Sequence, residues 1–162
     1  MKIDVVMPGY NSFGLLNKNL PLLVAELSRY KGTEIIIVDD CSDQEDFRKT
    51  KHFIETQFPS SGIKLLRNEK NLGFSSTVNR GVSESNADFV VLLNTDVIPQ
   101  GNFLEASLAE LVSDKNLFGV GFMDKSIEDE KIILRGRGTA RWKRGFLSHG
   151  RGEVDREDTF WI

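Results

Sequence analysis

The chain has 162 residues, of which 40% are hydrophobic and 28% charged, and its formal net charge is −3. This length and apolar content predict a single domain, 1–162, with one core that buries about 68–70% of the surface of the unfolded chain. The negative charge argues against a general nucleic-acid binder. No apolar run approaches the roughly 20 residues that span a bilayer. The single cysteine, Cys41, excludes an internal disulfide and is typical of a reducing, cytoplasmic compartment.

Three continuous apolar runs are each followed directly by polar or turn residues. They are Ile3–Met7 before Pro8-Gly9-Tyr10-Asn11, Ile35–Val38 before Asp39-Asp40, and Phe89–Leu93 before Asn94-Thr95-Asp96. Such runs predict strands that are buried on both faces of a parallel sheet covered by helices. Open α/β sheets bind ligands at the carboxyl ends of their strands. Asp39 and Asp96 are therefore the strongest candidates for the chemistry of this chain.

Segments with helical periodicity separate these strands. Leu16, Leu20, Leu23 and Leu27 form one such segment, and Pro21 within it predicts a kink or a fresh helix start, with Asn19 as a possible cap. Ser42-Asp43-Gln44-Glu45 has the spacing of a capping box. Further expected elements are helices through Phe47–Phe58, Phe74–Val82 and Phe103–Val112 and strands at Ile63–Leu66 and Leu117–Phe122. Helix-length crossovers of this kind predict parallel strands that are joined right-handedly, and hence an α/β fold.

The periodicity changes beyond Met123, so we expect an α/β core at 1–124 and a distinct segment at 125–162. Ile132–Leu134 and the region around Trp142 and Phe146 predict a pair of strands or a long loop. Basic residues crowd this last third: Lys131, Arg135, Arg137, Arg141, Lys143, Arg144 and Arg151. They form either a solvated hairpin face or a surface that attracts an anionic substrate or membrane.

Four short motifs follow one another in order along the chain. They are Pro8-Gly9-Tyr10-Asn11, Ile37-Val38-Asp39-Asp40-Cys41-Ser42, Asn71-Leu72-Gly73-Phe74 with Asn79-Arg80-Gly81, and Leu93-Asn94-Thr95-Asp96-Val97. Together they resemble the nucleotide-sugar half of a family 2 glycosyltransferase, over residues 3–122. The third motif, and the Asn that opens the fourth, are most similar to bacterial rhamnosyltransferase-like members that build surface polysaccharides.

This resemblance implies the GT-A fold, a Rossmann-like and mostly parallel sheet flanked by helices, here with a C-terminal hairpin or extended segment. It also implies metal-dependent, inverting transfer of a sugar from a UDP- or dTDP-linked donor to a glycan or lipid-linked acceptor. The residues that it implicates in nucleotide binding are Pro8, Tyr10, Asn11, Asp39, Asn71, Gly73, Asn79, Asn94 and Thr95.

Asp39 is expected to accept a hydrogen bond from the N–H of the base, while Asp40 caps the turn that follows. Tyr10 would cover the base or the ribose, or would instead pack beneath the first helix.

The resemblance places a divalent ion, Mg²⁺ or Mn²⁺, at Asp96. Mg²⁺ is commonly held by one or two carboxylates together with substrate phosphates and water. The family's Asp-x-Asp motif begins here with Asn94, whose neutral carbonyl attracts a cation less strongly than a carboxylate does. The alternative is that Asn94 and Asp96 only form a turn before Pro99.

Inverting transfer also needs a general base, which the resemblance places in a later segment of the chain. Asp155, Glu157 and Asp158 lie in a mixed-charge stretch that is typical of a solvated loop. We therefore expect the catalytic base and most of the acceptor site beyond residue 162, in a sequence cut after its donor-binding half.

Two other functions stay open at this stage. The chain could be a non-catalytic module that binds a nucleotide sugar, or one part of a two-chain enzyme. A nucleotidyltransferase is less favoured, because Pro8–Gly14 lacks the basic residue of a phosphate loop. We further expect a cytoplasmic location, with peripheral contact at the inner face of the membrane. Phe160 and Trp161 near the chain end favour pairing with a second copy.

Overall fold

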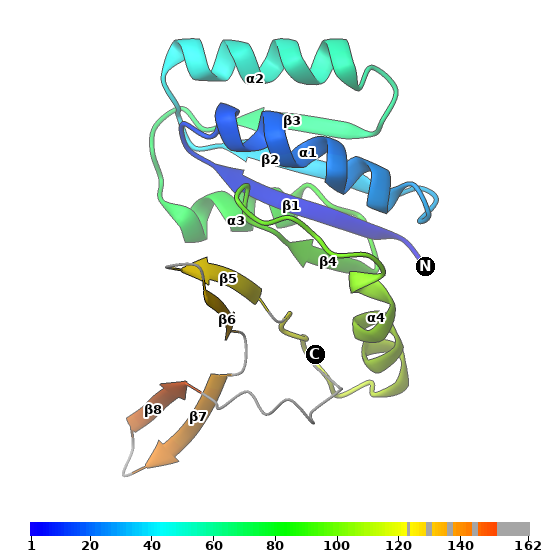
Figure 1. Ribbon diagram of the computed structural model, residues 1–162, viewed down its shortest axis with the longest axis vertical. Coiled ribbons are helices and arrows are strands. Elements are labelled where there is room, and N and C mark those ends of the chain that lie inside the picture. Colours follow the sequence, from blue (N-terminus) through cyan, green and yellow to red (C-terminus); the bar gives the residue numbers. More distant parts are fainter. Residues whose placement is uncertain (123, 129–130, 136–137, 144–145, 152–162) are drawn as a thin grey trace. The chain divides into compact units, whose positions relative to one another are not determined.

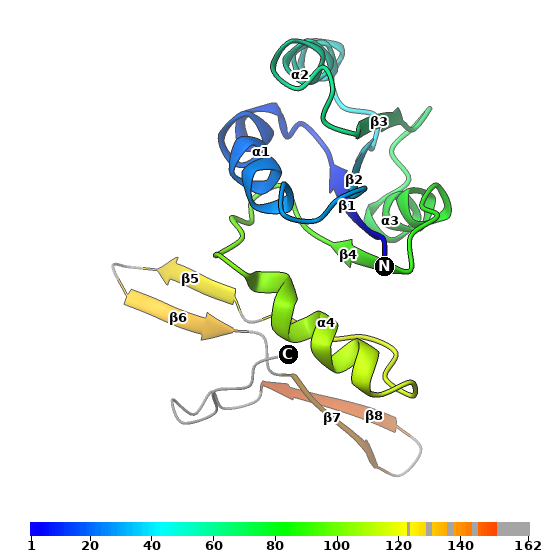
Figure 2. The same cartoon turned by 90° about the vertical axis from the view of Figure 1, so that its right-hand side faces the viewer.

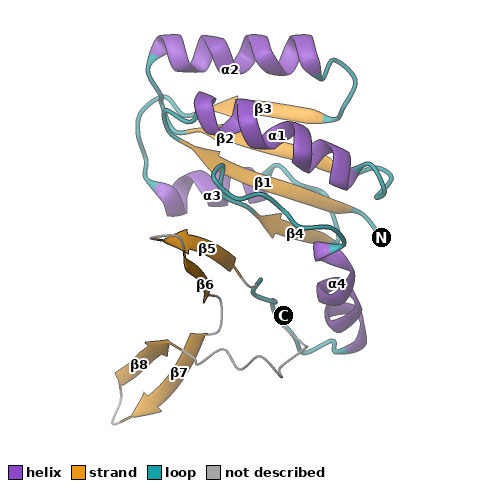
Figure 3. Ribbon diagram, in the orientation of Figure 1, coloured by secondary structure: helices purple, strands orange, loops and turns teal. Residues whose placement is uncertain are grey.

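The computed structural model describes residues 1–122, 124–128, 131–135, 138–143 and 146–151. The chain separates into two compact units, Met1–Pro99 and Gln100–Ile162. The first unit alternates strands with helices in the order β1 (Ile3–Gly9), α1 (Phe13–Leu27), β2 (Glu34–Asp39), α2 (Gln44–Gln57), β3 (Ile63–Arg67), α3 (Phe74–Ser83) and β4 (Phe89–Leu92) (Figures 1 and 3). The predicted α/β fold is confirmed.

The four strands of this unit form a parallel sheet with the order β3-β2-β1-β4. Successive crossovers advance from β1 to β3 and then return past β1 to β4. Right-handed connections therefore place α1 and α2 on one face of the sheet and α3 on the other, as Figure 2 shows for α1 and α3. The central strands β1 and β2 supply the core between these layers, with Val6, Ile36 and Val38 fully buried.

Helix α3 lies close to the sheet because residue 81 is a glycine. A Cβ built on Gly81 would overlap Cγ1 of Val6 and lie 3.1 Å from Cγ2 of Val38. Both valines are fully buried and have no room to move aside.

Strand β4 differs from the prediction that it is buried on both faces. Val91 and Leu93 are buried, but Leu92 is 52% exposed. The reason is that β4 stands at the edge of the described sheet and pairs only with β1. The apolar run in the sequence therefore identified a strand but not its place in the sheet.

The predicted strand at Leu117–Phe122 is wrong, because this segment is irregular and Phe118 is fully exposed. Gly119 and Gly121 lower the strand propensity of the segment. A strand also needs a hydrogen-bonding neighbour, and the ladders of the described residues include none for this segment.

Helix α1 runs through Pro21 without the predicted fresh start, and Asn19 is buried in its interior rather than acting as a cap. Burial of Leu16, Leu20, Leu23 and Leu27 outweighs the cost of about 3 kcal/mol for an interior proline. The first turn of α1 is instead capped from α2, since the Phe13 N–H donates to both carboxylate oxygens of Asp46 at 3.3 Å.

The predicted capping box at Ser42–Glu45 does not form. Asp43 is the N-cap of α2, and its side chain makes no capping hydrogen bond. The hydroxyl of Ser42 is used elsewhere, because it accepts a hydrogen bond from the backbone N–H of Asn11.

The second unit contains α4 (Phe103–Ser113) and two antiparallel hairpins, β5 (Asp124–Glu128) with β6 (Lys131–Arg135) and β7 (Gly138–Lys143) with β8 (Phe146–Arg151). These hairpins confirm the strand alternative for the segment beyond Met123. Arg137, Arg144, Asp155, Glu157, Asp158 and Thr159–Ile162 lie outside the described residues. None of the helices in the described ranges combines the length and the apolar character that a membrane crossing requires. The internal division at residue 124 stays a prediction.

Candidate functional site

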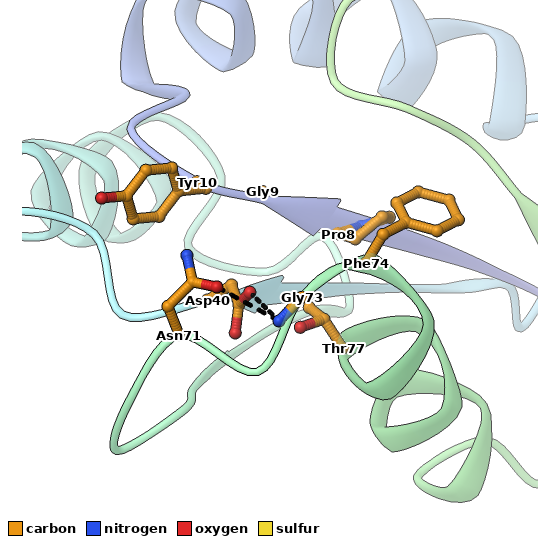
Figure 4. A pocket seen from close by; sticks show the side chains of 8 residues that line it. All are labelled: Pro8, Gly9, Tyr10, Asp40, Asn71, Gly73, Phe74 and Thr77. Atoms are coloured by element: carbon orange, nitrogen blue, oxygen red, sulfur yellow. Dashed lines mark hydrogen bonds between the residues drawn. The ribbon is translucent and has the colours of Figure 1, made fainter.

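A pocket of about 230 Å³ opens at the carboxyl ends of β1 and β2 (Figure 4). It is lined by Pro8, Gly9, Tyr10, Asp40, Asn71, Gly73, Phe74 and Thr77. Four of the residues predicted for nucleotide binding therefore meet here: Pro8, Tyr10, Asn71 and Gly73. The volume lies below the roughly 300–1,000 Å³ of pockets for drug-sized ligands. The pocket suits one part of a larger ligand, such as a base or a ribose.

Two aromatic rings stand at this pocket with much of their surface exposed, Tyr10 at 55% and Phe74 at 61%. Figure 4 shows the ring of Tyr10 beyond the end of β1 and above Asn71. This exposure disagrees with the alternative that Tyr10 packs beneath α1. An exposed ring at a strand end can stack on a flat ligand group.

Asp40 forms the floor of the pocket and is only 5% exposed. Its Oδ1 accepts hydrogen bonds from Asn68 Nδ2 at 2.7 Å and Leu72 N at 2.8 Å, and its Oδ2 accepts one from Gly73 N at 2.8 Å. Burial opposes ionisation of this carboxyl, but the hydrogen bonds from Leu72, Asn68, Thr77 and Gly73 outweigh it and hold its pKa below the ordinary value. Asp40 therefore shapes the loop before α3 as an anion.

The prediction that Asp40 caps the turn after β2 is wrong, because its carboxylate accepts hydrogen bonds from Leu72 N and Gly73 N in the loop before α3 instead. It is Asp39 that closes the turn after β2, since its Oδ2 accepts a hydrogen bond from Ser42 N at 3.1 Å. The sequence could not show which of the two carboxylates faces the pocket.

Asn68 links Asp40 to α3 and was not singled out from the sequence. Its Nδ2 also donates to Thr77 Oγ1 at 3.0 Å, and its Oδ1 accepts a hydrogen bond from Arg80 Nη1 at 2.6 Å. Asn68 is 2% exposed, so this amide is buried and both of its polar atoms have partners. The network joins the end of β3 to the first two turns of α3 and fixes the wall of the pocket that Thr77 forms.

Asp39 is 7% exposed and forms an ion pair with Arg67, whose Nε lies 3.3 Å from Asp39 Oδ2. The guanidinium of Arg67 lies 4.3 Å from the centre of the Phe47 ring and also donates to the carbonyl of Ser42 at 2.6 Å. Within the described residues, the hydrogen bond and the ion pair of the Asp39 side chain both involve Oδ2. Its Oδ1 remains the oxygen that could accept from a ligand.

Asn11 joins the loops that follow β1 and β2 instead of lining the pocket. Its N–H donates to Ser42 Oγ at 2.8 Å, and its Oδ1 accepts a hydrogen bond from Asp43 N at 2.9 Å. Its φ of 47° lies in the left-handed region, which asparagine tolerates better than most residues. The side-chain oxygen of Asn11 is thus occupied. Asn79, also predicted for nucleotide binding, is exposed on α3 and does not line the pocket.

The loop after β4 presents the predicted acidic motif. Asn94 and Asp96 are exposed, whereas Thr95 between them is 8% exposed. The N–H of Val97 donates to the carbonyl of Asn94 at 3.3 Å, so the motif forms a turn.

Among the described residues, no group of three or more Asp, Glu, His or Cys side chains could hold a metal ion. One carboxylate and one amide oxygen suit a hard cation that takes its other ligands from phosphate and water.

These features define a class of protein. An open parallel sheet with a pocket at the carboxyl ends of its strands is the arrangement of a ligand-binding α/β domain. The model of the glycosyl transferase family 2 matches residues 4–160, and the chain belongs to this family.

Known proteins support this assignment. The chain is 28% identical to N-acetylgalactosaminyltransferase 7 from Drosophila melanogaster over 124 residues, which cover 76% of this chain and 21% of the relative. The chain spans less than half the length of the curated relatives that it matches first.

Solved structures show the same fold. TarS 1-349 from S. aureus, in complex with UDP-GlcNAc, matches with a TM-score of 0.58 and 22% identity, over 70% of this chain and 32% of that structure. The mannosyltransferase PcManGT from Pyrobaculum calidifontis, in complex with GDP-Man and Mn²⁺, matches with a TM-score of 0.61 and 20% identity, over 79% and 36%.

Proposed function

We propose that this chain binds the nucleoside diphosphate of a sugar donor at the carboxyl ends of β1, β2 and β4 and serves glycosyl transfer. The observation that carries the proposal is the pocket at Pro8, Tyr10 and Asn71, which lies at the strand ends of a family 2 glycosyltransferase chain. The donor is UDP- or dTDP-linked, since a carboxylate at Asp39 suits the N–H that uracil and thymine share.

The residues divide the ligand among them. The exposed ring of Tyr10 covers the base or the ribose, and base–aromatic stacking of this kind contributes about 1–3 kcal/mol. Asp39 accepts the N–H of the base through Oδ1, while Arg67 and Ser42 N hold Oδ2 and so fix the orientation of the carboxylate. Asn71, which is exposed at the pocket, offers its amide nitrogen to the ribose.

The diphosphate lies toward the loop after β4, where Asp96 and Asn94 would hold Mg²⁺ or Mn²⁺. When bound, such an ion neutralises charge on the departing diphosphate. With a single carboxylate the loop binds the ion weakly by itself, because most of the ligands come from the nucleotide and water. Asp96 is exposed and therefore accessible to both.

The resemblance to family 2 glycosyltransferases implies four further features of the reaction and its setting. They are inversion at the transferred sugar, a glycan or lipid-linked acceptor, membership of the rhamnosyltransferase-like subgroup and a part in cell-envelope polysaccharide synthesis. A cytoplasmic location at the inner face of the membrane agrees with a lipid-linked acceptor.

Titration calorimetry tests the donor site. UDP and dTDP are titrated into the protein with Mn²⁺ and with chelator, and ADP serves as the control ligand. We expect tighter binding of the pyrimidine nucleotides with Mn²⁺. Tyr10→Ala should weaken UDP binding about 5- to 150-fold in both conditions, since the loss of stacking does not depend on the ion. The matched control is Glu55→Gln on the exposed face of α2, which should bind UDP like the wild type.

Equal affinity for UDP and ADP would refute the pyrimidine assignment. An unchanged affinity in Tyr10→Ala would remove this pocket from the nucleotide site. Release of UDP from a panel of UDP-sugars, measured with and without sugar acceptors, then tests transfer itself.

A further inference from the structure

Asn19 is a buried polar residue in the middle of α1, and it contacts the loop that follows β4. Its side chain is 3% exposed, and Nδ2 donates to the backbone carbonyl of Thr95 at 2.9 Å. The two residues are 76 positions apart in the sequence. The contact thus connects the first helix directly with the centre of the Asn94–Asp96 turn.

The amide of Asn19 has no second role within the described residues. Its Oδ1 is buried without a hydrogen-bond partner. An unpaired buried oxygen lowers stability, and a leucine of similar size would avoid this cost. The contribution of this amide to the fold is therefore the hydrogen bond from Nδ2 to the Thr95 carbonyl.

Thr95 is held from a second side by β1. A Cβ built on Gly9 would lie 3.6 Å from Cγ2 of Thr95, so the threonine side chain packs against the end of this strand. Leu93 N also donates to Val6 O at 3.0 Å, which continues the sheet up to the turn. With Thr95 held inward, the side chains of Asn94 and Asp96 are both left exposed.

We propose that Asn19 is a positioning residue for the acidic turn: its amide holds the Thr95 carbonyl so that Asn94 and Asp96 face the diphosphate and its divalent ion. This inference rests on the proposed function of the turn. It assigns to α1 a role in ion-dependent binding that no residue of the turn itself reveals.

The test compares UDP affinity with Mn²⁺ and with chelator in four proteins: the wild type, Asn19→Leu, Asp96→Asn and Leu27→Ala. The measured quantity is the dissociation constant of UDP in chelator divided by its dissociation constant with Mn²⁺, so a larger ratio means stronger enhancement by the ion. Partners that orient metal ligands typically change metal affinity about 10- to 100-fold when they are removed. We expect Asn19→Leu to lower the ratio about 10-fold, toward that of Asp96→Asn, with UDP affinity in chelator unchanged. Leu27→Ala removes a buried side chain from the same helix, about two turns beyond Asn19, and should keep the ratio of the wild type.

A ratio in Asn19→Leu equal to that of the wild type overturns the positioning role. The role is also overturned if Leu27→Ala lowers the ratio as much as Asn19→Leu does. A wild-type ratio of one has a different meaning, because it overturns the ion-binding role of the turn and the positioning role with it. Thermal unfolding shows whether each variant is folded. If Asn19→Leu does not fold, Asn19→Ala is compared in the same way, and retention of the wild-type ratio there also overturns the proposal.

Discussion

Replacing Asp40 by asparagine tests the link between the pocket and the stability of the fold. The carboxylate accepts hydrogen bonds from Asn68 Nδ2, Leu72 N and Gly73 N, among other donors. An amide offers only one oxygen, so its NH₂ group must face at least one of these donors. A hydrogen bond to a charged group contributes about 1.5–3 kcal/mol. We expect Asp40→Asn to lower the free energy of unfolding by about 3 kcal/mol.

The matched control is Asp43→Asn, which makes the same chemical change three residues away. Asp43 is exposed, and its side chain makes no capping hydrogen bond. Asparagine and aspartate are nearly equivalent at an N-cap, so this variant should unfold within about 0.5 kcal/mol of the wild type. Urea denaturation followed by circular dichroism measures both variants.

The pH dependence of the same two proteins gives a second measurement. The pKa of Asp40 is lower in the folded chain than in the unfolded chain, where the carboxyl has its ordinary value of about 3.8. Its contribution to stability is therefore complete above about pH 4–5 and is lost as the pH falls through the lowered pKa. The difference between the wild type and Asp40→Asn should shrink in acid. A difference below about 0.5 kcal/mol at pH 7, or one that grows in acid, would refute this account of the network.

Three further predictions concern α3 and the acidic residues. Gly81→Ala should destabilise the fold by about 1–3 kcal/mol, because the new methyl group would overlap Val6. Gly14→Ala adds a methyl group in open space within α1 and should instead stabilise the fold by about 0.4–1 kcal/mol. Thermal unfolding compares the two variants. Asp39→Asn should weaken UDP binding by about 1.5–3 kcal/mol with and without Mn²⁺, as calorimetry would show. Asp96→Asn should abolish the strengthening by Mn²⁺ and leave the affinity in chelator unchanged, and identical behaviour of the two variants would contradict this division of roles.

The tertiary structure decided features that depend on which residues meet. Pro21 was expected to interrupt α1, but the helix continues because its leucine stripe is buried against the rest of the unit. The run at 117–122 is apolar, but it contains two glycines and has no neighbouring strand in the described ladders. In both cases the prediction from local pattern was wrong, because burial or strand pairing elsewhere in the chain determined the outcome.

The sequence by itself determined the α/β class and the strand ends that carry the site. Buried parallel strands are continuous apolar runs, and the polar residues after them must lie at one edge of the sheet. That rule placed Pro8, Tyr10 and Asp96 at strand ends without knowledge of the fold. The partners of Asp39 and Asp40, the bridging amide of Asn68 and the contact of Asn19 with Thr95 were decided only in the tertiary structure. Apart from the turn that Asp39 closes with Ser42, these contacts join residues that are separated in the chain by other elements or loops, and no local periodicity or motif encodes them.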